Sequence, residues 1–248
     1  MSTALDDYWK LQDRVTRTAD RLFTLHRPHL KCGRGCYYCC DEITVLPIEI
    51  EAARRWIDRH GRPDPTRLGG PPDDRGDTPQ LVNDRSTYGV HPNPDSPSRS
   101  DPESSLGSGS TAAPRPRRCG FLGTAGECTI YGGRPLICRT HGLPLAYRVY
   151  EYDERGRELH PEDPDYVDLW CDLNFTCDGG AAAIDALTDD GRINMAAINE
   201  ELEQLNDRFL TEQSSDRFGE SGADEPGTDG SGPADRYPLA ILLDPRRK

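Results

Sequence analysis

The feature that most constrains this chain is a run of four cysteines within nine residues, Cys-Gly-Arg-Gly-Cys-Tyr-Tyr-Cys-Cys at positions 32–40. A thiolate is a soft, anionic metal ligand, and gaps of two or three residues allow one tight turn to direct several sulfurs to the same point. Five more cysteines follow between residues 119 and 177. The candidate ligands are therefore Cys32, Cys36, Cys39, Cys40, Cys119, Cys128, Cys138, Cys171 and Cys177.

A disulfide framework is the alternative use of so many cysteines, and it requires an oxidising compartment and normally a signal peptide. The chain opens Met-Ser-Thr-Ala-Leu-Asp-Asp and shows neither the basic start nor the apolar stretch of such a signal. The cysteine count of nine is odd, and the adjacent residues Cys39 and Cys40 bridge each other only with strain. We therefore expect reduced thiols and a cytoplasmic location.

The composition restricts the classes of partner. Only 34% of the 248 residues are hydrophobic, and the chain contains 24 glycines and 21 prolines, so much of it is not core. A formal net charge of -13 repels phosphate backbones and anionic membrane surfaces. No apolar run reaches the roughly 18 residues of a membrane span. We expect neither a nucleic acid nor a membrane as partner; a protein partner stays open.

Two helices should flank the cysteine run. Apolar residues recur at helical spacing over 5–26, and Pro28 ends that helix, so the cysteine run begins in a turn. Residues 43–46 are typical of a short strand. Pro47 suits the first turn of a second helix, for which Gly61 is the expected C-terminal stop.

A second ordered region lies further along the chain. Residues 145–152 are rich in β-branched and aromatic side chains and lead into Asp-Glu-Arg-Gly-Arg, which indicates a β-hairpin turn. Another amphipathic helix is expected after Gly191, through Phe209. Together these elements predict a small, helix-rich α+β domain with a short β-hairpin, wrapped around the cysteines.

The remaining stretches are polar and lack periodicity. The expected organisation is an N-terminal half (1–61), a disordered low-complexity insert (62–118), the second half of the metal-binding domain (119–210) and a disordered acidic tail (211–248). The two halves can still meet across the insert, because closure of a flexible loop costs only about 0.6 kcal/mol per doubling of its length. The tail ends in an apolar segment, 237–243, for which the two alternatives are docking on a partner and docking back on the core; we expect the second.

The cysteine motifs also carry a family resemblance. After the first run come Cys-x-Phe-Leu from Cys119, Cys-x-Ile-Tyr from Cys128 and Arg-Pro-Leu-x-Cys-Arg from Arg134. This combination resembles the bacterial YkgJ-type cysteine-cluster proteins, the zinc- or iron-chelating CxxCxxCC family, over about residues 30–60 and 117–178. The family label has two residues in its first gap, whereas this chain has three. The resemblance implies a bound iron-sulfur cluster or zinc, but no known reaction for most members.

The number and kind of metal centres stay open at this point. Eight thiols would satisfy two four-thiolate centres, whereas a single 4Fe-4S cluster would leave five cysteines over. Vicinal cysteines and a glycine-lined loop favour an iron-sulfur cluster over a zinc ion. Nearby cations would stabilise the thiolates, and the candidates for this role are Arg34, Arg134, Arg139 and His141. The other five histidines are interpreted as surface or turn residues.

Three functional alternatives follow from the same cysteines. Cys32, Cys36 and Cys39 also resemble a radical S-adenosylmethionine cluster loop, although Cys40 and the paucity of strand-helix units argue against it. The block is similar to that of flagellin lysine N-methylases, yet we find no Gly-rich loop for a methyl donor. The third alternative is non-catalytic: a zinc-stapled module that binds a protein partner, or a metal centre that carries electrons.

Overall fold

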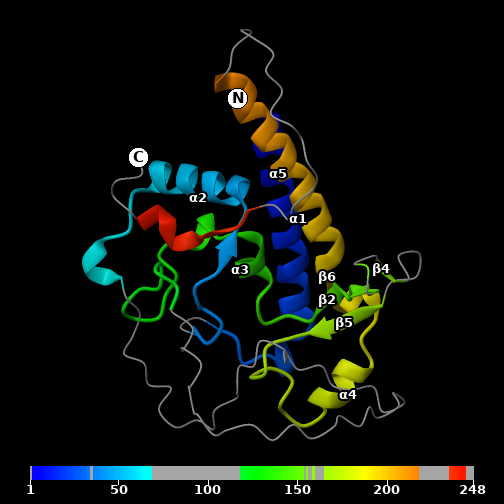
Figure 1. Ribbon diagram of the computed structural model, residues 1–248. Helices are drawn as coiled ribbons and strands as arrows, with labels where there is room; N and C mark the ends of the chain where they lie inside the picture. Colours follow the sequence, from blue (N-terminus) through cyan, green and yellow to red (C-terminus); the bar gives the residue numbers. More distant parts are fainter. Residues whose placement is uncertain are drawn as a thin grey trace, which may run out of the picture.

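The computed structural model describes residues 2–33, 36–68, 118–153, 155, 158–159, 165–217 and 235–243. Within these ranges the chain has the predicted α+β class. Two long helices, α1 (Thr3–Leu25) and α5 (Met195–Arg217), lie side by side, and α2 (Pro47–His60) crosses them near one end (Figure 1). Arg208 pairs with Asp7 and Arg14 with Glu201, which is the order expected of antiparallel helices.

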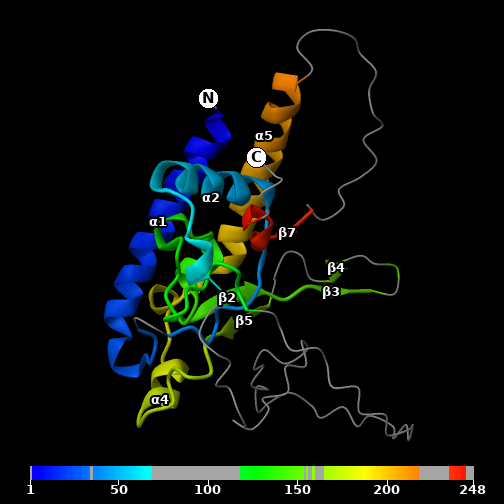
Figure 2. The same ribbon diagram turned by 90° about the vertical axis from the view of Figure 1, so that its left-hand side faces the viewer.

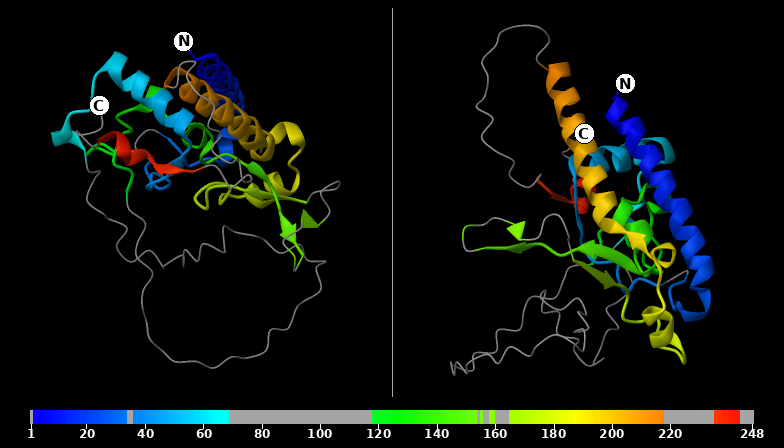
Figure 3. Two further views of the ribbon diagram at one scale, coloured as in Figure 1. Left: turned by 45° about the horizontal axis from the view of Figure 1, so that its top comes forward. Right: turned by 90° about the vertical axis from the view of Figure 1, so that its right-hand side faces the viewer.

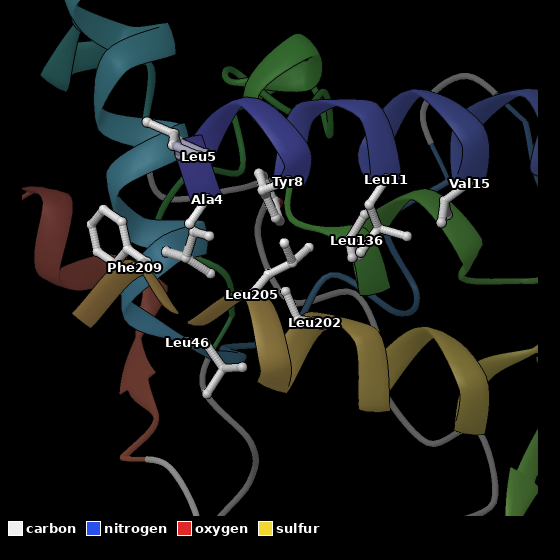
Figure 4. Packing of buried hydrophobic residues seen from close by; sticks show 12 residues of the cluster. Ala4, Leu5, Tyr8, Leu11, Val15, Leu46, Leu136, Leu202, Leu205 and Phe209 are labelled. Carbon is white, nitrogen blue, oxygen red and sulfur yellow. The ribbon is translucent and has the colours of Figure 1, made fainter. Parts of the chain in front are cut away.

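The first helix forms where the sequence predicts it. Ser2 caps its N-terminus, because the Ser2 Oγ accepts a hydrogen bond from the Leu5 N–H at 3.1 Å. After Leu25 the chain enters a 3-10 helix, η1 (Arg27–His29), which contains Pro28. The apolar face of α1 packs on α2 and α5, with Leu136 between the long helices (Figure 4). This core cluster contains Ala4, Leu5, Tyr8, Leu11, Val15, Leu46, Ile48, Ala52, Leu136, Leu202, Leu205 and Phe209.

The limits predicted for α2 are confirmed. Pro47 occupies its first turn, where a missing N–H costs nothing. The helix ends before Gly61, whose φ of +92° is a conformation that other residues rarely adopt. At its start, the buried Glu49 carboxylate accepts the N–H of Leu46 at 3.2 Å.

Among the described residues, no helix has the length and apolar character that a bilayer span requires.

A small three-stranded sheet packs at the other end of the long helices. Its order is β5 (Tyr166–Leu169), β2 (Leu145–Arg148), β6 (Ile193–Asn194), with β2–β5 antiparallel and β2–β6 parallel. The predicted strand 145–152 is divided in two, because only residues up to Arg148 pair with β5. The second part, β3 (Glu151–Tyr152), forms the predicted hairpin with β4 (Glu158–Leu159) and extends away from the helices (Figure 2).

The C-terminal apolar segment docks on the core, as predicted. Strand β7 (Tyr237–Pro238) pairs antiparallel with β1 (Thr44–Val45), and the 3-10 helix η5 (Leu239–Leu243) follows beside α2 (Figure 3). Leu239 is buried, and a Cβ on Gly120 would lie 2.7 Å from the Leu243 Cδ1. The segment therefore covers one of the loops that carry cysteines.

Two predicted boundaries differ from the structure. The expected insert 62–118 begins with ordered chain, because residues 65–67 form a 3-10 helix, η2 (Pro65–Arg67), and Leu68 bridges to Gly123. Helix α5 continues to Arg217, past the predicted start of the tail. Residues 69–117, 218–234 and 244–248 of the predicted insert and tail lie outside the described residues.

Several short elements were not predicted, because they have too few residues to show a period. They are α3 (Leu136–Thr140), α4 (Gly180–Asp185), η3 (Tyr131–Gly133) and η4 (Asp189–Gly191). One of them matters for the cysteines, since α3 carries Cys138 and packs against α1.

Candidate metal centre

All nine cysteines are described, and all are free thiols. Eight are half-buried, and Cys177 is exposed. They lie on three segments: the loop between η1 and β1, the stretch from residue 118 to α3, and the loop between β5 and α4. The structure therefore brings together the two sequence blocks that the polar insert separates.

The β5–α4 loop is fastened to the end of α1. The Phe175 N–H donates to the His29 carbonyl at 2.7 Å, and the Lys31 N–H donates to the Asn174 Oδ1 at 2.8 Å. Phe175 has a φ of +57°, an uncommon conformation for a residue with a side chain. Its ring stacks on His29 with the centroids 5.7 Å apart. These contacts place Cys171 beside the start of the first cysteine run.

A first group of thiols forms around this junction. The Asn174 Nδ2 donates to the Cys32 Sγ at 3.2 Å and to the Gly142 carbonyl at 2.6 Å. The thiols of Cys171 and Cys36 also lie close enough to Cys32 to shift its pKa. Cys39 lies close enough to interact electrostatically with Cys32 and Cys171. Group A, as we call it, contains Cys32, Cys36, Cys39 and Cys171.

A second group forms where residues 40–41 run antiparallel to residues 118–119. The Cys119 N–H donates to the Cys40 carbonyl at 3.0 Å, and Asp41 bridges to Arg118. The chain then turns back, so that Cys128 bridges to Leu122. Group B contains Cys40, Cys119, Cys128 and Cys138, and each of the last three interacts electrostatically with Cys40.

Three cysteine sulfurs accept hydrogen bonds from the backbone. The donors are the N–H groups of Phe121 to Cys119, of Ile130 to Cys128 and of Leu173 to Cys171. In each case the donor lies two residues after the cysteine, so a local turn wraps the backbone around the sulfur. Such N–H donors stabilise the anionic form of sulfur, which is the form that binds metals.

The thiols divide into more acidic and less acidic members. Burial raises the pKa of Cys119 to about 11 and also raises the pKa of Cys128. The hydrogen bond from Cys39 lowers the pKa of Cys40 to about 7, and the hydrogen bond from Cys32 lowers the pKa of Cys171 to about 7. Each group thus contains one cysteine whose pKa is lowered and at least two whose pKa is raised. Full ionisation of a group requires a bound cation, and metal binding would release protons.

Of the four residues predicted to stabilise the thiolates, Arg134 has the clearest place. It favours the anionic form of Cys40, Cys128 and Cys138, and its guanidinium lies 3.6 Å from the ring centroid of Tyr131. Arg34 lies outside the described residues.

The other two predicted residues have different roles. The Arg139 side chain donates to the carbonyl of Gly132 at 2.7 Å and to the Thr16 Oγ1 at 3.1 Å, so it chiefly ties α3 to α1 and η3. Burial lowers the pKa of His141, and Arg134 acts in the same direction, so its imidazole is neutral at pH 7. Among the contacts of the described residues, none joins His141 to a cysteine.

Sequence reasoning missed two residues of the site. Asn174 is buried and holds Cys32, yet no motif singles it out. Arg118 lies over the Tyr37 ring at 4.6 Å and favours the thiolate of Cys40, although the sequence placed it in the insert. The interpretation of His26 as a surface or turn residue was wrong, because His26 is buried and its Nε2 donates to the Gly191 carbonyl at 2.6 Å. Only the tertiary contacts identify these roles.

Cys177 stands apart from both groups. Its Sγ lies 3.4 Å from the His29 Nδ1 and 3.7 Å from the Pro28 carbonyl oxygen. Both neighbours belong to η1, so the contacts explain the position of the thiol without a metal. Cys177 is therefore the weakest of the nine predicted ligands.

The donor chemistry of the two groups fits a thiophilic metal, because soft sulfur ligands select zinc and iron-sulfur clusters. As the side chains stand, no three Cys, His, Asp or Glu residues in the described part of the chain form a group that could hold a metal ion. The fit therefore rests on the number of thiols, their N–H donors and their cationic neighbours. Coordination would require the sulfurs to close further around an ion or cluster.

Comparisons with known proteins add no family. No family model, curated protein or solved structure matches this chain. Any interpretation of the function accordingly depends on the residues and contacts described above.

Proposed function

We propose that this chain is a metal-binding protein whose clustered cysteines hold an iron-sulfur cluster or zinc. The observation that carries the proposal is that cysteines from both halves of the chain come together, held by the backbone hydrogen bond from Cys119 to Cys40 and by the bond from Asn174 to the Cys32 sulfur. Backbone N–H donors at Cys119, Cys128 and Cys171 support it, because they favour the thiolate form that a metal requires. The resemblance of the motifs to the YkgJ-type cysteine-cluster proteins points to the same ligands.

The positions of the thiols support a structural role for the metal. Four cysteines lie on the loop between η1 and β1, two on the stretch before α3, one on α3, and two on the loop between β5 and α4. A metal held by these cysteines would join loops and short elements, most of which lie outside the long helices. Binding of a structural metal can contribute on the order of 10 kcal/mol to folding. A reducing compartment such as the cytoplasm would keep the thiols available.

The test is purification without oxygen, followed by metal analysis, assay of acid-labile sulfide and a visible absorption spectrum. Iron with sulfide and a brown colour would support a cluster, and stoichiometric zinc in a colourless protein would support a mononuclear centre. Either result supports metal binding. A chain that is folded but carries neither metal, and takes up neither on reconstitution, would contradict the proposal.

A substitution sharpens this test. Cys36→Ser should lower the metal content and the thermal stability, because Cys36 belongs to group A. Cys177→Ser is the matched control, since the contacts of the exposed Cys177 thiol within the described part of the chain are with η1. Equal metal content and equal melting temperatures in the two variants would count against the proposed ligands.

A further inference from the structure

The C-terminal segment 237–243, which comprises β7 and η5, is fastened to the chain just after the first cysteine run. Strand β7 pairs antiparallel with β1, and the Leu239 N–H donates to the Ile43 carbonyl at 3.0 Å. Ile43 lies three residues after Cys40 in the sequence. One end of the segment is therefore held by the backbone that leads away from the cysteine run.

The other end of the segment contacts the second cysteine-bearing stretch. A Cβ added to Gly120 would lie 2.7 Å from the Leu243 Cδ1, so the Leu243 side chain lies directly against this backbone. Gly120 follows Cys119 in the sequence, and Cys119 packs on the buried cluster that contains Leu239. The segment therefore lies across the junction at which the Cys119 N–H donates to the Cys40 carbonyl.

The attachment of this segment is shallower than the packing of the long helices. Leu239 is buried, whereas the other residues of the segment are half-buried or exposed. Pro238 has no N–H to donate to β1, and a two-stranded ladder is only marginally stable without further packing. Helix α1, by contrast, buries side chains from Ala4 to Leu22. Segments with few buried apolar side chains open locally at a smaller cost in free energy than unfolding of the whole molecule.

We propose that residues 237–243 form a strap that opens locally and controls the access of dissolved reagents to the Cys119 thiol. In the closed position, Leu239 fills the apolar cluster and Leu243 covers the backbone at Gly120. When the strap opens, both leucines leave these positions, and the half-buried Cys119 becomes more accessible. The inference goes beyond the proposed function, because it rests on backbone pairing and apolar packing and holds with or without a bound metal.

Hydrogen exchange of the unchanged, full-length protein, followed by mass spectrometry, tests whether the strap opens by itself. The amides of residues 237–243 should exchange roughly tenfold faster than those on the facing sides of α1 and α5, yet more slowly than in a free peptide of the same sequence. Exchange as slow as that of the long helices would overturn the inference, because the segment would then open only on global unfolding. Exchange as fast as in the free peptide would also overturn it, since the segment would not be docked.

A substitution links the strap to the thiol. Leu239→Asp places a carboxylate at the buried position that anchors the segment, and an unpaired charge is costly to bury, so the strap should open. Brief alkylation with iodoacetamide, read by peptide mass spectrometry, then measures access to Cys119, and its labelling rate should rise roughly tenfold. Tyr237→Ser is the matched control, because this exposed side chain belongs to the same segment, and it should leave the rate unchanged.

Cys171 serves as the reference thiol in the same molecules, because it is half-buried like Cys119 but lies on the β5–α4 loop. Its labelling rate should be the same in Leu239→Asp and in the unchanged protein. Unchanged labelling of Cys119 in Leu239→Asp, or an equal rise at Cys171, would overturn the inference. Metal analysis of the same samples reports on the proposed function separately, since absence of metal from the unchanged protein would count against that function and leave the strap intact.

Discussion

Asn174 shows how one buried amide can organise a set of thiols. Its side chain is almost inaccessible to solvent, yet each of its polar atoms has a partner. The Oδ1 accepts from the Lys31 N–H, and the Nδ2 donates to the Cys32 Sγ and to the Gly142 carbonyl. The residue therefore joins the loop after η1, the turn after α3 and the β5–α4 loop. Such a fully bonded polar group orders its surroundings, because removal leaves several groups unpaired.

Asn174→Ala should lower both stability and metal content. The Lys31 N–H and the Gly142 carbonyl would lose their partner, at a cost of about 1–3 kcal/mol in the free energy of unfolding. Metal affinity at group A should fall by roughly 10–100-fold, as for other residues that orient a ligand. Urea denaturation and competition with a chelator measure the two effects. Thr176→Ala, in the same loop but exposed, is the control, and equal behaviour of the two variants would contradict the assigned role.

At the level of elements, Glu49 connects the starts of two helices. Its Oε2 accepts from the Leu46 N–H at the start of α2, and its Oε1 accepts from the Leu136 N–H at the start of α3, both at 3.2 Å. Next to it, the Ile48 N–H donates to Asn206 on α5 at 3.2 Å. Because α3 carries Cys138, this buried carboxylate helps to position that cysteine. Burial raises the pKa of Glu49, and the two backbone donors oppose that rise.

The raised pKa predicts the pH dependence of stability. Between the unfolded pKa, about 4.5, and the higher folded pKa, the folded chain holds a proton that the unfolded chain has lost. The contribution of Glu49 to stability is therefore largest at low pH and decreases as pH rises through this window.

Glu49→Gln removes this titration and serves as the reference. The free energy of unfolding of the unchanged protein minus that of Glu49→Gln should fall when urea denaturation is repeated from pH 4.5 to pH 7.5. Effects of acid on the thiols are common to both proteins and cancel in the difference. A difference that rises with pH would refute the assignment of a raised pKa to Glu49.

The whole molecule combines a helical core with a cysteine-bearing part. The cluster between α1, α2 and α5 contains no cysteine, whereas Cys119 and Cys128 pack against the cluster that includes Phe121, Ile130 and Leu239. The first cluster buries large aliphatic side chains from long helices and so has its own source of stability. The second cluster combines side chains from short segments, so its stability depends on the contacts that hold the loops of these segments together.

Removal of the metal should therefore affect the two parts differently. After chelation, amide hydrogen exchange should accelerate in residues 30–33, 36–46, 118–143 and 171–177, while the facing sides of α1 and α5 stay protected. Hydrogen-exchange mass spectrometry of the metal-bound and metal-free protein measures this. Cooperative loss of protection throughout both long helices would show that the helical core does not stand without the metal.

The sequence by itself determined the local features of this protein. Helical spacing with Pro28, Pro47 and Gly61 defined the flanking helices, because these signals act within a few residues. The cysteines predicted the chemistry of the proposed metal site, since thiolates bind few kinds of metal. The hairpin at β3 and β4 also followed from its turn residues.

Only the tertiary structure decided how these parts combine. The grouping of the thiols depends on contacts across the chain, such as Cys40 with Cys119 and Asn174 with Cys32, and no local pattern encodes such contacts. The pairing of β2 with β5, the burial of Glu49 and the separation of Cys177 have the same origin. The spacing of the cysteines is a local feature of the sequence, but the packing of distant segments decides which cysteines lie near one another.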